Sequence, residues 1–303
     1  MLIDDIEYVM FRHPDPLAAG AFMTEFGLLP LPSEGPAVYL RSHGDAPFSY
    51  LTEPGEAAFV GMGFRVVDRA ALTQLAQRFS TDVKACPHPG GGEYIVTTDP
   101  EGRRLEFVHG AQRREPMPIT SAPIAWNDAH ARQRKGRFQR PAYGPAHVRR
   151  LGHLAVFSAD APALIDWYRQ QLGFVPSELV YQGSAEHVVA SFMHLDKGDE
   201  WTDHHTLAII QSQAPALEHI SFECTDFDDL GMGHTYLKDQ GRRHRWGLGR
   251  HMYGSQGFDY WYDPADFHVE HYVDGDLVND STPTLTLPIG RDTMLQWGHV
   301  LAE

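Results

Sequence analysis

The stretch YDPADFHVEHY (residues 262–272) places the carboxylate of Glu270 in an apolar and aromatic setting that is typical of a strand, shortly after an Asp-Pro turn. The stretch TDPEGRRLEFVHG (residues 98–110) has the same design, with Glu106 in the equivalent place. In both stretches the Glu follows the Asp of the turn by seven positions. A repeated design at this distance indicates an internal duplication, which is the first feature to establish in any sequence.

Two further pairs of segments repeat along the chain. Residues 5–28 resemble residues 150–174, because each has an apolar strand pattern, an Asp suited to a helix N-cap, apolar residues at helical spacing and a closing Gly. Residues 57–79 parallel residues 215–237 with strand, turn and helix in the same order. A strand-rich stretch that ends in the Asp-Pro…Glu element follows each of the segments 57–79 and 215–237. The repeats therefore predict an α+β fold of four βαβββ modules, paired into two barrel-like domains.

The repeats also predict the boundaries of the chain's parts. A first domain, a linker, a second domain and a tail are expected at residues 1–110, 111–147, 148–280 and 281–303. The linker is rich in Pro, Arg and Gln with weak periodicity, which is typical of a segment that crosses the surface. Trp297 and Leu301 predict that the tail docks on the body of the protein.

Composition excludes several classes of protein. The chain has 303 residues and a formal net charge of −15, and it carries no basic stripe that would bind nucleic acid. Its two cysteines, Cys86 and Cys224, allow at most one disulfide, which favours a reducing compartment. We see neither a signal peptide nor an apolar run of the ~20 residues that a membrane helix needs. These features predict a cytoplasmic protein with no membrane or nucleic-acid partner.

Alignment of the repeats brings three positions of each domain into register. They are His153, His219 and Glu270 in the second domain, and Tyr8, Gly61 and Glu106 in the first. Two histidines and one carboxylate form the facial set of ligands found in non-haem Fe(II) oxygenases. A single strand histidine is more often an ordinary buried residue, so the prediction depends on the shared register of all three. We call His153, His219 and Glu270 the triad, and we expect the first domain to bind no metal.

Further polar side chains surround the triad in sequence. His251 and Tyr260 precede Glu270, with intervals of nine and ten residues between the three, and His205 stands just before an apolar strand pattern. Histidine suits proton transfer because its pKa lies near neutrality. His204 adjoins His205, but only one of two successive residues on a strand can face a pocket. Arg245 could contact a substrate carboxylate or hydroxyl, but an arginine at such a position is more often solvated, so we expect Arg245 to be solvated.

The second domain resembles type I extradiol ring-cleaving dioxygenases of the vicinal oxygen chelate superfamily, through the pattern Gly249–His251…Tyr260…Asp263–Pro264…Glu270. The chain departs from the family's pattern at Asp259 and Asp266, which are turn or flanking positions. The resemblance covers nearly the whole chain, including the duplication.

The resemblance implies a function and a role for each residue. The triad would bind Fe(II), with Mn(II) as an alternative, and the substrates would be a substituted catechol and O2. His205 would act as acid and base, whereas Tyr260 and His251 would contact the substrate oxygens. The product would be a ring-opened semialdehyde or acid, and the protein would assemble into a homo-oligomer.

Two other functions are compatible with such a scaffold. One is a different metalloenzyme of the same superfamily, either glyoxalase-like or a hydroxyphenylpyruvate-type dioxygenase. The other is a binding protein without enzymatic activity. The presence of all three triad residues together with His205, His251 and Tyr260 favours the extradiol enzyme.

Overall fold

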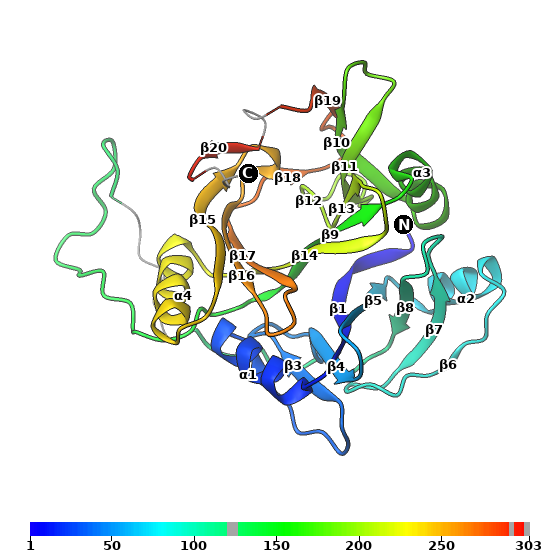
Figure 1. Cartoon of the computed structure of the whole chain (residues 1–303), viewed down its shortest axis with the longest axis horizontal. Helices are drawn as coiled ribbons and strands as arrows, with labels where there is room; N and C mark the ends of the chain where they lie inside the picture. Colours follow the sequence, from blue (N-terminus) through cyan, green and yellow to red (C-terminus); the bar gives the residue numbers. More distant parts are fainter. Residues whose placement is uncertain (120–126, 291–293, 300–303) are drawn as a thin grey trace.

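The computed structural model describes residues 1–119, 127–290 and 294–299. Four βαβββ modules follow one another along the chain, as predicted (Figure 1). The first comprises β1 (Ile3–His13), α1 (Pro16–Phe26), β2 (Leu29–Pro30), β3 (Val38–Arg41) and β4 (Tyr50–Pro54). The second comprises β5 (Ala58–Val66), α2 (Arg69–Arg78), β6 (Lys84–Ala85), β7 (Glu93–Thr98) and β8 (Arg104–His109).

The second domain repeats this order. Its first module comprises β9 (Arg150–Ser158), α3 (Ala161–Leu172), β10 (Phe174–Tyr181), β11 (Val188–Leu195) and β13 (Leu207–Gln211), with the short β12 (Thr202–Asp203) inserted before β13. Its second module comprises β14 (Ala216–Glu223), α4 (Phe227–Asp239), β15 (His244–His251), β16 (Gly257–Tyr262) and β17 (His268–Val273). A single 3-10 turn at Tyr253–Ser255 lies between β15 and β16.

Each of the four helices begins at an aspartate. The side chains of Asp15, Asp68, Asp160 and Asp226 accept hydrogen bonds from backbone N–H groups of the first helical turn. These bonds satisfy donors that have no partner inside a helix, which fixes where each helix starts. The predicted caps at Asp15 and Asp160 are confirmed, and Gly27 and Gly173 end the helices that follow them.

The two domains share one strand order. The first sheet has the order β2-β3-β4-β1-β5-β8-β7-β6, and the second has β10-β11-β13-β9-β14-β17-β16-β15 with β19 (Leu285–Pro288) and β20 (Leu295–Trp297) added at its edges. A separate two-stranded sheet joins β12 to β18 (Leu277–Val278). The predicted α+β class and its module plan are therefore confirmed.

The register of the central strands is the same in both domains. Tyr8 on β1 pairs with Gly63 on β5, which pairs in turn with Glu106 on β8. In the second domain His153 on β9 pairs with Ser221 on β14, which pairs with Glu270 on β17. Because Gly61 and His219 each precede this central residue by two positions, they occupy equivalent places.

The two Asp-Pro turns connect the domains to each other. Within each turn the carboxylate of Asp99 or Asp263 accepts two backbone N–H groups, so the Asp builds the turn itself. Asp99 also accepts a hydrogen bond from Tyr168 of the second domain at 3.2 Å. Asp263 lies 2.7 Å from the imidazole of His13 in the first domain. Each domain therefore anchors the other through the same structural element.

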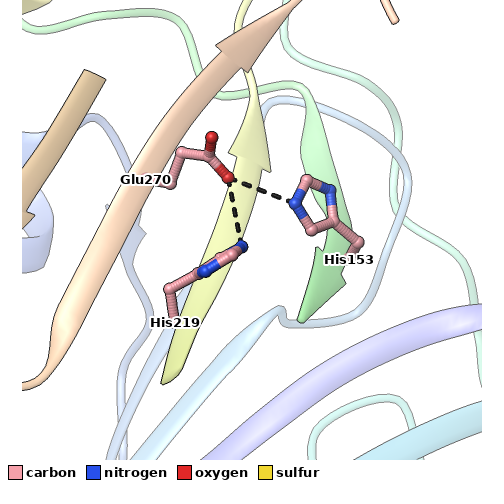
Figure 2. Close-up of side chains that lie close together, drawn as sticks. All are labelled: His153, His219 and Glu270. Carbon is pink, nitrogen blue, oxygen red and sulfur yellow. Dashed lines mark ion pairs between the residues drawn. The ribbon is translucent and has the colours of Figure 1, made fainter. Parts of the chain in front are cut away.

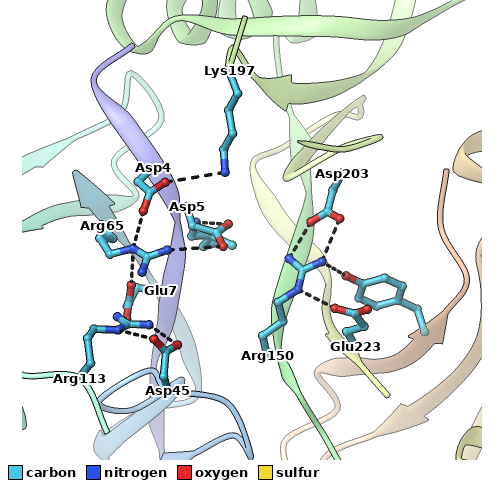
Figure 3. Close-up of polar contacts among 12 residues, drawn as sticks. Asp4, Asp5, Glu7, Asp45, Arg65, Arg113, Arg150, Lys197, Asp203 and Glu223 are labelled. Atoms are coloured by element: carbon cyan, nitrogen blue, oxygen red, sulfur yellow. Dashed lines mark hydrogen bonds and ion pairs between the residues drawn. The ribbon is translucent and has the colours of Figure 1, made fainter. Parts of the chain in front are cut away.

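Charged side chains of β1 lie close to charged side chains of the second domain near the domain boundary (Figure 3). Lys197 of the second domain approaches Asp4 of the first at 3.8 Å. Arg150 forms ion pairs with Asp203 and Glu223, both at 2.6 Å. Burial raises the pKa of Asp5, which lies beside this group, to about 6.

The remaining segments lie at the edges of this core. The tail supplies β19, which pairs with β10, and β20, which pairs with β15. Leu301 lies outside the described residues. In the linker the hydroxyl of Tyr143 donates to Asp239 on α4 at 2.9 Å. Cys86 and Cys224 are both free. Among the described residues no helix is long and apolar enough to cross a membrane.

Candidate active site

The three triad side chains meet on adjacent strands β9, β14 and β17 (Figure 2). Glu270 Oε2 lies 3.1 Å from His153 Nε2 and 3.4 Å from His219 Nε2. All three side chains are buried, and Glu270 has no exposed surface. The structure thus brings together three residues that are separated by 66 and 51 positions in the sequence (219 − 153 and 270 − 219).

The triad leaves buried polar atoms without hydrogen bonds. Among the described residues, both carboxylate oxygens of Glu270 and the Nε2 atom of His219 have no hydrogen-bond partner. Leaving such groups buried and unsatisfied costs about 1–3 kcal/mol each. A divalent cation between the three side chains would satisfy these atoms at once, so the residues present fit a metal centre of the facial type.

Charge also prepares the carboxylate for a cation. Burial alone would raise the pKa of Glu270, but its contacts with His153 and His251 and the charge of His219 outweigh burial. The pKa of Glu270 therefore lies well below its usual value, and the side chain is ionised at neutral pH. Burial lowers the pKa of His153, which keeps its imidazole neutral and free to bind a metal.

Glu218 supports the triad through a contact with His219, and this role was not predicted from the sequence. It lies at a β-bulge in β14, where the register with β9 shifts between Leu217 and His219. Its carboxylate contacts the Nδ1 atom of His219, so it can fix the tautomer that presents Nε2 to a metal. Its pKa lies well below the usual value because the charges and hydrogen bonds of His219, His268 and Arg245 outweigh burial. The sequence signal that could have identified Glu218 is its position next to the candidate ligand His219.

Arg245 completes this supporting layer. Its guanidinium donates to Glu218 at 3.0 Å, and the side chain is only 16 % exposed. The expectation of a solvated arginine was therefore wrong. The bulge that turns Glu218 toward the cavity places a mostly buried anion there, 14 % exposed, and Arg245 pairs with it.

His205 lies against the triad. Its ring centroid is 4.2 Å from that of His153 and 5.1 Å from that of Phe192. Burial lowers the pKa of His205 well below its usual value, so the imidazole is neutral and can accept a proton from a bound substrate. Its Nδ1 atom lies 3.1 Å from Nδ1 of His204, which does not line the cavity.

His251 and Tyr260 form a hydrogen-bonded pair on the other side of the triad. His251 Nε2 lies 2.9 Å from the Tyr260 hydroxyl and 3.4 Å from Glu270 Oε1. The His251 ring stacks on Phe258 with centroids 3.9 Å apart, which fixes its orientation. Burial and the charge of Glu270 raise the pKa of Tyr260 well above its usual value, so its hydroxyl keeps its proton and can donate a hydrogen bond.

These side chains open onto one cavity of about 310 Å³. Its polar groups include His153, His205, His219, His251 and Tyr260. The rest of its wall is largely apolar and comes from β9, β10, β11, β13, the 3-10 turn and the tail, with Phe157, Val180, Phe192, Ile210, Ile289 and Met294 among its residues. Because strands from across the sheet line the same space, the sheet curves around it.

The raised pKa of Glu178, on β10, predicts how the stability of the fold depends on pH. Its Oε2 atom lies 3.5 Å from Nε2 of His204. Burial raises the pKa of Glu178 to about 7, and burial lowers the pKa of His204 to about 4. When folding raises the pKa of a carboxyl group, the free energy of unfolding falls as the pH rises from the unfolded pKa through the folded one. For Glu178 the total loss is about 3 kcal/mol between pH 4.5 and 7.

Glu178→Gln removes this ionisation. We therefore expect urea unfolding to show a variant more stable than the parent by up to about 3 kcal/mol at pH 8, with most of the gain gone at pH 5. A stability difference that stays constant between the two pH values would contradict the assignment.

The equivalent residues of the first domain are arranged differently. Glu106 accepts hydrogen bonds from Tyr8, from His88 at 3.0 Å and from Arg104 at 2.6 Å, so its carboxylate is already satisfied. A Cβ atom at Gly61 would lie 1.9 Å from the backbone oxygen of Arg104, so this backbone leaves no room for a histidine there. The first domain therefore offers one carboxylate and no paired imidazoles at the position of the triad.

Comparison with known proteins identifies relatives of the whole chain. The model of the Glyoxalase/Bleomycin resistance protein/Dioxygenase superfamily matches residues 150–270. Metapyrocatechase 2 of Cupriavidus necator is 26% identical over 99% of this chain and 91% of its own length. The iron-dependent extradiol dioxygenase of Rhodococcus jostii (strain RHA1) is 23% identical over 88% of this chain and 86% of its own.

Solved structures agree on the fold. The Mn(II)-bound glyoxalase from Novosphingobium aromaticivorans superimposes with a TM-score of 0.80 at 20% identity, over 98% of this chain and 91% of that one. The βαβββ modules, their shared register and the family model at residues 150–270 agree with the superfamily that the sequence predicted. Residues 150–270, which carry the triad, belong to the glyoxalase/bleomycin resistance protein/dioxygenase superfamily.

Proposed function

We propose that this protein is an extradiol dioxygenase that cleaves the ring of a substituted catechol with O2, at Fe(II) held by His153, His219 and Glu270. The observation that carries the proposal is the buried triad with unsatisfied oxygens and nitrogen, at the wall of a cavity that also holds His205, His251 and Tyr260. Two relatives that match most of the chain are named metapyrocatechase and extradiol dioxygenase, which supports this reaction over others of the superfamily.

Fe(II), when held by His153, His219 and Glu270, would supply a Lewis acid for the diol and a path for electrons from the substrate to O2. The chain's own residues orient the substrate and move its protons. His205 is neutral and buried beside His153, so it can take a proton from a catechol hydroxyl and return it later. The Tyr260 hydroxyl and His251 lie together on the side of Glu270, where they can hydrogen-bond a substrate oxygen.

The cavity wall supports a finer proposal about the substrate. Apart from the groups around the triad, the described part of the wall consists mainly of aliphatic and aromatic side chains, and Arg245, the arginine among these described residues, is engaged by Glu218. A substituent that bears a carboxylate would lose its hydration on entering the cavity and would find no free cation among the described residues of the wall. We therefore expect catechols with an apolar substituent to be better substrates than those with a charged one.

An oxygen-electrode screen over substituted catechols tests the proposal. After anaerobic loading with Fe(II), and in parallel with Mn(II), we expect catechol-dependent O2 uptake and the yellow colour of a ring-fission product. The fold match to a glyoxalase makes glyoxalase activity the second candidate, so the same loaded protein is assayed with a glyoxalase substrate. Absence of O2 uptake with every catechol and both metals would contradict the proposal. A cytoplasmic location and assembly into a homo-oligomer remain predictions.

A further inference from the structure

A second group of metal-binding side chains lies outside the triad. His234 on α4, His244 on β15 and Asp259 on β16 present one ligand atom each, and these atoms all lie within 4.8 Å of one another. Asp259 Oδ1 is 3.1 Å from His234 Nδ1 and 2.8 Å from His244 Nε2. We call these three residues the α4 cluster. Asp259 adjoins Tyr260, but successive strand residues face opposite sides of a sheet, so the cluster lies on the side away from the catechol cavity.

The α4 cluster has the same donor set and nearly the same spacing as the triad. In the triad the carboxylate oxygen is 3.1 and 3.4 Å from the two imidazole nitrogens. Ligands of a tetrahedral zinc ion, at bond lengths of about 2.0–2.1 Å, are roughly 3.3 Å from one another. The α4 cluster therefore needs only a small opening to admit such an ion.

The charge and burial of Asp259 favour a cation at the α4 cluster. Asp259 is fully buried, and among the described residues neither a lysine nor an arginine pairs with it. Its carboxylate lies within hydrogen-bond distance of the imidazoles of His234 and His244 and of the indole of Trp261. A buried anion with only imidazole and indole partners is a site that a divalent cation would stabilise.

Trp261 supplies the support that a metal-binding carboxylate usually has. Its indole N–H donates to Asp259 Oδ2 at 2.6 Å, which orients Oδ1 toward the two histidines. The side chains of His234 and His244 are 18% and 28% exposed, so water can reach the cluster and complete a fourth position. The closed side is formed by Trp261, whose ring centroid lies 5.5 Å from that of His234 and 4.8 Å from that of His244.

We propose that His234, His244 and Asp259 form a second divalent-cation site that takes Zn²⁺ through two imidazoles, one carboxylate and water. The ion ties α4 to the hairpin of β15 and β16, which carries His251 and Tyr260 on its other side. This site goes beyond the proposed dioxygenase function and does not depend on it, because it shares no residue with the triad.

Zinc binding to full-length protein whose triad is disabled tests the proposal. In a Glu270→Gln background, titration with Zn²⁺ followed by gel filtration and metal analysis is expected to give about one zinc per chain. Adding His244→Gln is expected to weaken zinc binding at least about 100-fold, because loss even of an outer partner of a metal ligand typically costs 10–100-fold. The matched control is His187→Gln. His187 is exposed and belongs to neither the triad nor the α4 cluster, so its replacement should leave zinc binding unchanged.

Thermal unfolding gives a second readout that does not rely on a single variant. Zinc is expected to raise the Tm of the Glu270→Gln protein but not that of the protein with both Glu270→Gln and His234→Gln. His234 is partly exposed, so its replacement should preserve the fold. In the parent protein loaded with Fe(II), one iron and one zinc should be retained together. Failure of Glu270→Gln to bind zinc, binding that His244→Gln leaves intact, or zinc that merely displaces iron would each overturn the proposal.

Discussion

Protein with Glu270→Gln should be purified with less than a tenth of the iron of the parent and should lose catechol-dependent O2 uptake. Glu270 is the single anion of the triad, and its two oxygens have no hydrogen-bond partner in the part of the chain that the structure describes. Loss of an outer partner of a metal ligand already costs about 10–100-fold in metal affinity, so loss of the ligand's charge should cost at least about 100-fold. Metal analysis and an oxygen electrode measure the two effects on the same sample.

Glu106→Gln is the matched control, because Glu106 occupies the register position of Glu270 in the first domain. Its carboxylate binds Tyr8, His88 and Arg104, so the change should lower stability and leave iron content and turnover unchanged. Parallel thermal unfolding separates a loss of fold from a loss of metal. Iron content that falls in Glu106→Gln, or that survives in Glu270→Gln, would refute the assignment of the metal to the triad.

The duplication made most of the fold predictable from sequence. Because each module occurs twice, each boundary could be predicted from two segments of the sequence. Asp15 and Asp160 indicated where two helices start, because an N-cap hydrogen bond is local and needs no tertiary contact. The repeat also aligned residues on strands distant in sequence. In the structure His153 and Glu270 both pair with Ser221, so the alignment reflects a real neighbourhood of three strands.

Other features depended on geometry that sequence does not encode locally. Glu218 reaches the site through a β-bulge, which shifts the register by one residue and cannot be read from an alternating pattern. The α4 cluster combines a helix residue, His234, with Asp259 from a strand 25 positions later (259 − 234), and only the packing of α4 on β16 brings them together. The sequence showed Asp259 merely as a departure from a family pattern.

Replacing His205 with Phe is expected to keep the iron and remove most of the turnover. The His205 ring lies 4.2 Å from that of His153, yet it contributes no atom to the triad, so metal affinity should stay within a few-fold of the parent. General acid–base catalysis typically contributes 10²–10⁴-fold, and we expect kcat to fall by about that factor. Phe also conserves the aromatic contact with Phe192 at 5.1 Å, so the cavity wall should hold.

The measurement must separate proton transfer from a general disturbance of the cavity. Anaerobic titration with a catechol substrate should give a dissociation constant for His205→Phe within about tenfold of the parent, whereas steady-state O2 uptake collapses. His205→Gln serves as a second variant, because it restores a polar side chain that cannot act as an acid or base near neutral pH, and its kcat should stay low. If Gln restored turnover, hydrogen bonding by His205 would suffice and its role as a proton acceptor would be wrong. If Phe left kcat unchanged, the proton of the catechol would have to leave by another route, and the hydrogen-bonded pair of His251 and Tyr260 would be the next group to test.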